Sequence, residues 1–320
     1  MTGRACLLAA SLVILTSARP QEEPRPKLPE TLERRAVTIW SEGTRMAGDL
    51  YLPKGRKPDE KLPTLLLCHG WGGVKANLVA QAARFGQNGF IVLTFDYRGW
   101  GESDSKLVMV EKMPKPDEKG EVMVRARAVR EVVDPLDEAL DIKHALDWLM
   151  GEPGVENSRI GLWGTSYGGG LVAWTAAHDR RVKCVVAQVP GMGVRTEAAN
   201  RSADQRATQQ ARGEIDPVPQ SYDNVTGLRG YANIAKMRDY NAVAVADRVN
   251  VPILFIDAEN EELFDRRQHG AKAHEIIEAR GVPTRYHVVK GIKHYGIYRE
   301  ALEEATTQAL EWFKEHLKGK

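Results

Sequence analysis

Short, continuously apolar stretches recur along the middle of the chain and alternate with segments whose apolar residues repeat every three to four positions. The apolar stretches predict strands at residues 63–68, 90–95, 159–163, 182–189 and 251–256. The intervening segments at 76–87, 135–150 and 167–177 have helical periodicity. Strands that are apolar along their whole length and alternate with helices are typical of a parallel sheet covered on both faces. We therefore predict an α/β fold.

Further elements are expected at both ends of this pattern. Residues 37–40 and 46–52 predict two strands joined by a turn at Glu42-Gly43. Asp134 stands before a proline at the start of the helix predicted over 135–150, where it is the expected N-cap. After the strand at 251–256 the pattern predicts three more elements, which are a helix over 267–279, a strand over 285–289 and an amphipathic helix over 297–317.

Two segments interrupt the alternation of strands and helices. Residues 104–133 form an insertion in which two stretches, 107–111 and 121–127, alternate between apolar and polar side chains and predict a hairpin. Residues 190–248 are polar with few apolar runs, and we interpret them as a cap inserted into the core fold. Specificity for a substrate would depend on these two segments.

The first residues have the pattern of a secretory signal peptide. Arg4 provides a positive charge, residues 5–15 are apolar but too short for a stable membrane anchor, and small residues permit cleavage after Ala18. Residues 19–34, rich in Pro, Glu, Arg and Lys at their start, predict a disordered tail of the mature chain. We expect a secreted or periplasmic protein, without stable membrane insertion after cleavage of residues 1–18, whose single folded domain spans 35–320. An uncleaved membrane anchor is the alternative.

Composition and charge exclude several classes of function. The 320 residues, 42% of them hydrophobic, suffice for one large α/β domain or two small ones, and a net charge of +2 without a long basic run argues against nucleic-acid binding. Cys68 and Cys184 lie in apolar strands and are expected to be buried free thiols. A disulfide between them is the alternative. No metal-binding or dinucleotide motif is present, so we predict neither metal nor cofactor. The sequence leaves the oligomeric state open.

One pentapeptide carries the strongest chemical signal. The apolar strand at 159–163 continues directly into a Gly-x-Ser-x-Gly turn with Ser166 at its centre, and a helical segment follows. This is the arrangement of a nucleophile elbow, which exposes a serine hydroxyl on a sharp strand-to-helix turn. Because the carboxyl ends of parallel strands meet at one sheet edge, other polar residues that follow strands should lie nearby. These residues are His69, Asp96, Asp257 and His294.

Together these segments resemble the α/β-hydrolase superfamily, and within it the dienelactone-hydrolase-like and S9/S15-peptidase-like branch. The resemblance covers about residues 35–320 and rests on the motifs His69-Gly70-Trp71-Gly72-Gly73, Asp96-Tyr97-Arg98-Gly99, Gly164-Thr165-Ser166-Tyr167-Gly168-Gly169 and Lys293-His294. It implies an α/β-hydrolase fold, with a mostly parallel twisted sheet, and a serine hydrolase that forms an acyl-enzyme. The turn at 96–103 is structural in this superfamily, and Arg98 is expected to pair with a nearby carboxylate.

The resemblance also implies a base and an acid for Ser166. A serine hydroxyl needs a base to take its proton, and His294 lies in the loop that carries the superfamily's histidine. His287 is the rival, but it falls within a strand, where we expect it to pack or to be solvated. In relatives a strand, a small residue and two further positions precede the acid, and alignment on Ala258 makes Glu261 the acid. The alternatives are Asp257, Glu259 and Glu262.

The negative oxygen formed on acyl attack needs hydrogen-bond donors that already point to it. The backbone N–H of Tyr167 is one expected donor, and the backbone N–H of Trp71 is the second. His69 is expected to hold the loop that carries Trp71. The Trp71 side chain either lines the acyl pocket or fills the core.

These assignments predict a carboxylic-ester hydrolase that acts on a small-molecule ester. A serine peptidase or aminoacyl hydrolase of the prolyl-oligopeptidase or S15 type is the first alternative. A non-catalytic α/β-hydrolase-like binding protein is the second, although such proteins usually lack part of the triad. The sequence does not define the acyl or alcohol group.

Overall fold

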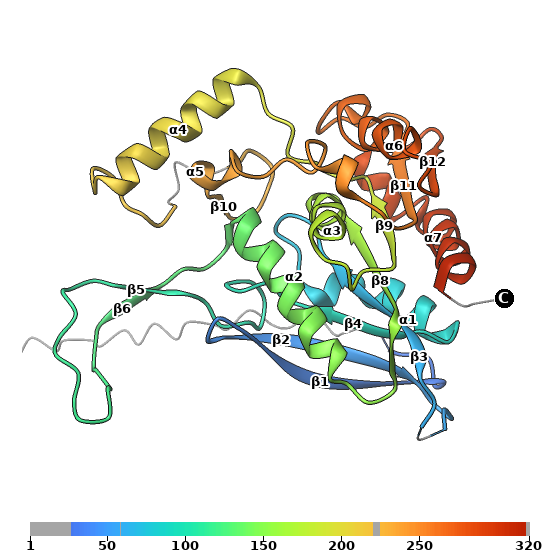
Figure 1. Ribbon diagram of the computed structural model, residues 1–320, viewed down its shortest axis with the longest axis horizontal. Helices are drawn as coiled ribbons and strands as arrows, with labels where there is room; N and C mark the ends of the chain where they lie inside the picture. The colour runs from blue at the N-terminus through green and yellow to red at the C-terminus, as the bar shows by residue number, and fades with distance from the viewer. Residues whose placement is uncertain (1–26, 58, 220–224, 318–320) are drawn as a thin grey trace, which may run out of the picture.

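The computed structural model describes residues 27–57, 59–219 and 225–317. The predicted signal peptide and most of the predicted tail lie outside these residues. Eight strands form the central sheet: β1 (Leu32–Ser41), β2 (Thr44–Pro53), β3 (Leu62–Cys68), β4 (Ile91–Phe95), β8 (Val155–Thr165), β9 (Cys184–Gln188), β11 (Ile253–Ala258) and β12 (Thr284–Val289). Their order in space is β1-β2-β4-β3-β8-β9-β11-β12, and the six strands from β4 to β12 are parallel. The predicted mostly parallel sheet is confirmed (Figure 1).

Helices cover both faces of this sheet. They are α1 (Val79–Gln87), α2 (Pro135–Met150), α3 (Tyr167–His178), α6 (Gly270–Glu278) and α7 (Leu302–Leu317). Neighbouring strand residues point to opposite faces, so Leu65 packs with Phe85 of α1 and Phe313 of α7, whereas Leu66 packs with Ile142 of α2 and other residues of α3 and α6. The two resulting apolar cores fix the sheet whose carboxyl edge carries the site. Of the described helices, none has the length and apolar character needed to cross a membrane.

The N-terminal strands begin earlier than the sequence pattern predicts. Residues 32–34, assigned above to a disordered tail, belong to β1 and pair with residues 51–53 of β2. The tail prediction is therefore wrong at its end, because Leu32 is buried against Gly86 of α1 and supplies an apolar anchor among charged neighbours. The predicted turn at Glu42-Gly43 joins β1 to β2, and both of its residues have a positive φ, at 48° and 81°.

Some predicted helices are divided in the structure. The helix expected over 76–87 begins as a short 3-10 turn, η1 (Lys75–Leu78), and the helix expected over 267–279 follows η4 (Arg266–Gln268). The final helix starts at Leu302 rather than at Ile297, because Ile297 and Tyr298 belong to a separate turn, η5 (His294–Tyr298). This turn carries a predicted site residue, His294.

The two interrupting segments lie against each other. The insertion contains a hairpin of β5 (Leu107–Met109) and β6 (Ala126–Ala128), which pair antiparallel as predicted. Both strands are shorter than the predicted stretches 107–111 and 121–127, and β6 ends one residue later than predicted. Residues 190–248 contain α4 (Glu197–Ala211), β10 (Tyr231–Ala232), α5 (Ile234–Met237) and η3 (Ala246–Arg248). A parallel pairing of β10 with β7 (Val132–Val133) joins the two segments. In Figure 1 the hairpin projects from the body of the molecule, and α4 and α5 lie above α2 in this view.

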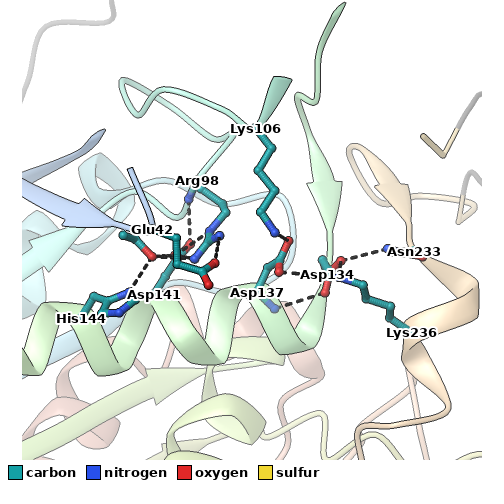
Figure 2. A network of polar contacts seen from close by, with 10 residues as sticks. Glu42, Arg98, Lys106, Asp134, Asp137, Asp141, His144, Asn233 and Lys236 are labelled. Atoms are coloured by element: carbon teal, nitrogen blue, oxygen red, sulfur yellow. Dashed lines mark hydrogen bonds and ion pairs between the residues drawn. The ribbon is translucent and has the colours of Figure 1, made fainter. Parts of the chain in front are cut away.

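Carboxylates near the start of α2 anchor both segments. Lys106 of the insertion lies 2.7 Å from Asp137, and Lys236 of α5 lies 2.8 Å from Asp134. Asn233 donates a hydrogen bond to Asp134, which also caps the helix as predicted by accepting from the Asp137 N–H. Figure 2 shows these side chains converging on one end of α2. The insertion and the residues around α5 are therefore tied to the same helix by charge.

Arg98 ties the turn after β4 to the same helix. Its guanidinium lies 2.6 Å from Asp141, which is fully buried, and 2.9 Å from Glu42 of the β1–β2 turn. Figure 2 shows Arg98 between Glu42 and Asp141. Ser41 completes this second network by contacting both Asp141 and Arg98. The prediction that Arg98 pairs with a nearby carboxylate is confirmed.

Candidate active site

Ser166 occupies the turn between β8 and α3. Its φ is 53° and its ψ is −124°, a conformation that non-glycine residues rarely adopt and that the surroundings must hold in place. The Ser166 N–H donates to the carbonyl of Gln188 at 2.8 Å, and the Ser166 carbonyl accepts from the Gly191 N–H at 3.0 Å. These bonds to β9 and the chain beyond it hold the strained residue on both sides.

Two glycines around Ser166 are required by close backbone contacts. A Cβ added at Gly164 would lie 2.2 Å from the Gly168 oxygen, and one added at Gly168 would lie 2.3 Å from the His69 oxygen. Neither distance is possible for real atoms, so only glycine permits these approaches. The second contact brings the loop after β3 directly against the turn that holds Ser166.

Ser166, His294 and Glu261 form one continuous chain of contacts. The Nε2 atom of His294 is 3.0 Å from the Oγ atom of Ser166, and its Nδ1 atom is 2.7 Å from the Oε2 atom of Glu261. The side chains of His294 and Glu261 are each 1% exposed. The other carboxyl oxygen of Glu261 accepts from the Leu263 N–H, which fixes the orientation of the carboxylate. The structure thus brings together the three residues predicted as nucleophile, base and acid.

The alternative acids have other partners. Asp257 accepts a hydrogen bond from Tyr286, and burial raises its pKa to about 7. Glu259 binds the Lys290 ammonium and the Gly291 N–H. Glu262 accepts a hydrogen bond from the backbone N–H of His294. Among the described residues, no hydrogen bond joins Glu262 to the imidazole ring of His294. Geometry therefore favours Glu261.

The rival histidine lies elsewhere. His287 is in β12, and its ring contacts Glu304 of α7 at 2.8 Å. His69 lies at the site, but its Nδ1 atom is 2.9 Å from the Gly70 oxygen, and burial lowers its pKa to about 4. A neutral, buried ring bonded to its own loop fits the predicted structural role of His69.

The segments that carry the two predicted oxyanion donors lie next to Ser166. Tyr167 is the first residue of α3, and the first N–H groups of a helix have no partner within it. The loop with Trp71 lies close by, since a Cβ at Gly70 would be 3.1 Å from the Cβ of Ser166. The Trp71 indole lines the cavity, donates to the Arg229 carbonyl at 3.0 Å and meets the Tyr167 ring edge-on. The Trp71 side chain therefore lines the cavity on one side and packs against the apolar core as well.

A cavity of about 590 Å³ opens over Ser166 and His294. Its wall is mainly aromatic and aliphatic, and no Asp, Glu, Lys or Arg of the described ranges lines it. The apolar lining consists of Trp71, Leu78, Tyr167, Leu228, Met237, Tyr240, Leu263, Phe264, Tyr295 and Tyr298. Such a pocket suits a neutral, apolar group next to the reacting atoms.

His269 and Tyr298 are polar residues at this cavity that were not among the predicted site residues. His269 accepts a hydrogen bond from the Met192 N–H at 3.0 Å, and its ring stacks on Phe264. Tyr298 places its hydroxyl 2.9 Å from the hydroxyl of Thr165, the residue before Ser166. His269 was assigned only to the start of a helix, and the position of Tyr298 within the Lys293-His294 loop region is the signal that could have drawn attention to it.

Comparison with known proteins places the chain in a family. The model of the prolyl oligopeptidase family matches residues 136–320, which is more than half of the chain and includes Ser166, Glu261 and His294. The chain belongs to the prolyl oligopeptidase family. The model of the X-Pro dipeptidyl-peptidase (S15) family matches residues 42–203, which include the loop with Trp71. Both matches agree with membership of the α/β-hydrolase superfamily.

The individual proteins that resemble this prolyl oligopeptidase family member carry different functional names. An uncharacterized 31.7 kDa protein of Escherichia coli, from the traX-finO intergenic region, is 28% identical over 80% of this chain and 92% of its own length. Thiohydrolase aneE of Aspergillus aculeatus is 32% identical over 47% of this chain and 39% of its own. The α/β hydrolase GrgF of Penicillium sp. sh18 superposes with a TM-score of 0.69 at 19% identity, covering 90% of this chain and all of that one. The last comparison shows the shared fold, and the family membership makes the chain a hydrolase.

Proposed function

We propose that this protein hydrolyses neutral carboxylic esters through an acyl-enzyme formed on Ser166. The observation that carries the proposal is the unbroken chain from the Ser166 Oγ atom through the His294 ring to the Glu261 carboxylate, with distances of 3.0 and 2.7 Å. Every contact needed to activate a serine is present, which argues against a non-catalytic binding protein. This line of contacts gives Ser166, His294 and Glu261 their separate roles in the reaction.

In the first half of the reaction, the Oγ atom of Ser166 attacks the ester carbonyl while its proton moves to the Nε2 atom of His294. Glu261 accepts from Nδ1–H, keeps the ring in the required tautomer and stabilises the imidazolium that forms. The ring then gives its proton to the leaving alcohol. In the second half, water attacks the acyl-enzyme carbonyl while His294 takes a proton from the water. The ring then gives this proton to the Oγ atom of Ser166, which leaves as the restored hydroxyl.

The tetrahedral intermediate carries a negative carbonyl oxygen. We assign its stabilisation to the backbone N–H groups of Tyr167, the first residue of α3, and of Trp71, in the loop that packs against Ser166 through Gly70. Donors fixed before the reaction need no reorganisation when charge develops. The required glycines at 164 and 168 preserve this arrangement.

The cavity supports a neutral ester rather than a peptide with a free amino terminus. A buried ammonium group needs an acidic partner, and no Asp or Glu of the described residues lines the cavity. The family matches favour a peptidase as the second candidate. The similarity to a protein named a thiohydrolase adds thioesters to the acyl donors that should be tested. The predicted signal peptide adds the proposal that the enzyme works outside the cytoplasm.

The test compares Ser166→Ala with Ser158→Ala, which changes an exposed serine on the same strand. We expect wild type and Ser158→Ala to hydrolyse p-nitrophenyl butyrate and the corresponding thioester, and Ser166→Ala to lose at least about 10³-fold in kcat/KM. A fluorophosphonate probe should label Ser166 alone. Full activity of Ser166→Ala, or an adduct on another residue, contradicts the proposal. Faster turnover of aminoacyl p-nitroanilides than of any ester would favour the peptidase.

A further inference from the structure

Three polar side chains form a second hydrogen-bonded line that ends at the cavity. Gln188 and Thr165 are paired residues of β9 and β8, and both are buried. The Nε2 atom of Gln188 donates to the Thr165 hydroxyl at 3.0 Å, and the Tyr298 hydroxyl lies 2.9 Å beyond it. Tyr298 also lines the cavity beside Ser166.

The hydrogen-bond donors and acceptors around the Thr165 hydroxyl permit an arrangement that leaves the Tyr298 proton free. A threonine hydroxyl has one proton and two lone pairs, and the Gln188 amide occupies a lone pair of Thr165. Thr165 can then donate its own proton to the Tyr298 oxygen. In that arrangement the Tyr298 proton is free for another acceptor, and Ser166, the residue after Thr165, lines the same cavity as Tyr298.

The environment of Tyr298 keeps this proton in place. Burial raises the pKa of its hydroxyl, and the neighbouring side chains of Thr165 and Ser166 offset only part of this effect. The phenol therefore stays protonated at neutral pH and remains a hydrogen-bond donor. Ser166 can accept this bond because it directs its own proton to His294.

We propose that Tyr298 is a catalytic residue whose hydroxyl donates to the Oγ atom of Ser166, in an orientation fixed by Thr165 and Gln188. This inference rests on the proposed acyl-enzyme chemistry. The bond stabilises negative charge on Oγ as His294 removes the serine proton, and again when Oγ becomes the leaving group during hydrolysis of the acyl-enzyme. No proton leaves Tyr298 in either step.

The first test is Tyr298→Phe, which removes the hydroxyl and keeps the ring against the cavity. We expect kcat/KM for p-nitrophenyl butyrate to fall about 10- to 100-fold, the effect of one hydrogen bond to a charged group, with KM changed less than about two-fold. Tyr51→Phe, a buried tyrosine of β2 outside the cavity, is the matched control and should keep wild-type activity. Activity of Tyr298→Phe within two-fold of wild type overturns the proposal.

A double-mutant cycle separates catalysis from structural support. Thr165→Val removes the donor that orients Tyr298 and should lower kcat/KM by a smaller factor. Combined with Tyr298→Phe, it should add almost nothing, because the hydroxyl that it orients is already absent. Fully multiplicative losses would overturn the line of bonds. If Tyr298→Phe does not fold, as judged by circular dichroism, Thr165→Val carries the test, and unchanged kcat/KM in that variant overturns the proposal.

The rate of fluorophosphonate labelling distinguishes failure of this inference from failure of the proposed function. Wild-type protein that neither hydrolyses esters nor is labelled at Ser166 refutes both. Wild-type protein that is labelled at the same rate as Tyr298→Phe refutes only the role of Tyr298. A labelling rate that falls about 10- to 100-fold in Tyr298→Phe, in step with kcat/KM, supports both.

Discussion

Glu261→Gln tests the residue for which the sequence left four alternatives. In the structure one oxygen of Glu261 accepts from the His294 ring at 2.7 Å, and the other accepts from the Leu263 N–H at 2.9 Å. Glutamine has one acceptor oxygen instead of two, so it can accept only one of these two hydrogen bonds. If its amide nitrogen faces the ring, it donates to Nδ1 and places the ring proton on Nε2, where Ser166 needs an acceptor. If the nitrogen faces Leu263, two donors meet.

The loss of charge adds to the loss of the hydrogen bond. Both side chains are 1% exposed, and a contact of 2.7 Å places the centres of a carboxylate and an imidazolium about 4 Å apart. At an effective dielectric constant of about 20, their attraction is about 4 kcal/mol. This energy is available only after His294 has taken the serine proton. The expected loss in kcat is therefore about 10³-fold, with little change in KM.

The assay is steady-state hydrolysis of p-nitrophenyl butyrate, with circular dichroism to verify folding. Glu259→Gln is the matched control because it makes the same chemical change in the same loop, where the carboxylate binds Lys290 at the surface. We expect this control to retain wild-type kcat. The reasoning is refuted if folded Glu261→Gln keeps kcat within about three-fold of wild type, or if Glu259→Gln loses as much.

Three further predictions concern buried ionisable groups. Burial raises the pKa of Asp257 to about 7, above the value of about 3.9 in an unfolded chain. Between about pH 4 and 7 the folded state therefore binds more protons than the unfolded state. The free energy of unfolding should fall by up to about 4 kcal/mol as pH rises through this window. Asp257→Asn should remove that slope in urea titrations at several pH values; an unchanged slope would exclude Asp257 as its source. Arg98→Ala leaves the fully buried Asp141 without its ion-pair partner and should reduce the free energy of unfolding by about 3–5 kcal/mol in urea denaturation, whereas a loss below about 1 kcal/mol would mean that the buried pair contributes little. Burial raises the pKa of the Cys68 thiol to about 12, so a disulfide reagent should modify Cys68 only upon unfolding, as mapped by mass spectrometry, and rapid modification of the native protein would contradict the buried position.

The strands of the sheet could be predicted because their residues are apolar on both faces. Residues 65–67 supply side chains to both cores, and such a stretch has only one stable environment. The pattern failed where a few residues decide the element. Over the five residues of η5, a period of three and a period of 3.6 hardly differ, so the pattern assigns Ile297 and Tyr298 of this turn to the final helix.

The candidate site could be predicted in part. Ser166 and His294 follow strands of a parallel sheet, which brings their positions to one edge. Glu261 came from the family resemblance alone, since nothing in the acidic stretch 257–262 distinguishes its members by pattern. The position of Tyr298 near His294 is a signal in the sequence, but its contact with Thr165, more than a hundred residues away, is visible only in the structure.

The wall of the cavity shows why substrate preference is harder to read than chemistry. Met237 lines the cavity, and the preceding residue, Lys236, binds Asp134 and Asp137 of α2. The position of Met237 in this wall therefore depends in part on ion pairs between α5 and α2, two segments that are distant in sequence. The reacting atoms, in contrast, are fixed by strand ends and close glycine contacts, which a sequence pattern can express. Chemistry and specificity in this protein are thus held by different kinds of interaction, and only the first kind leaves a regular signal in the sequence.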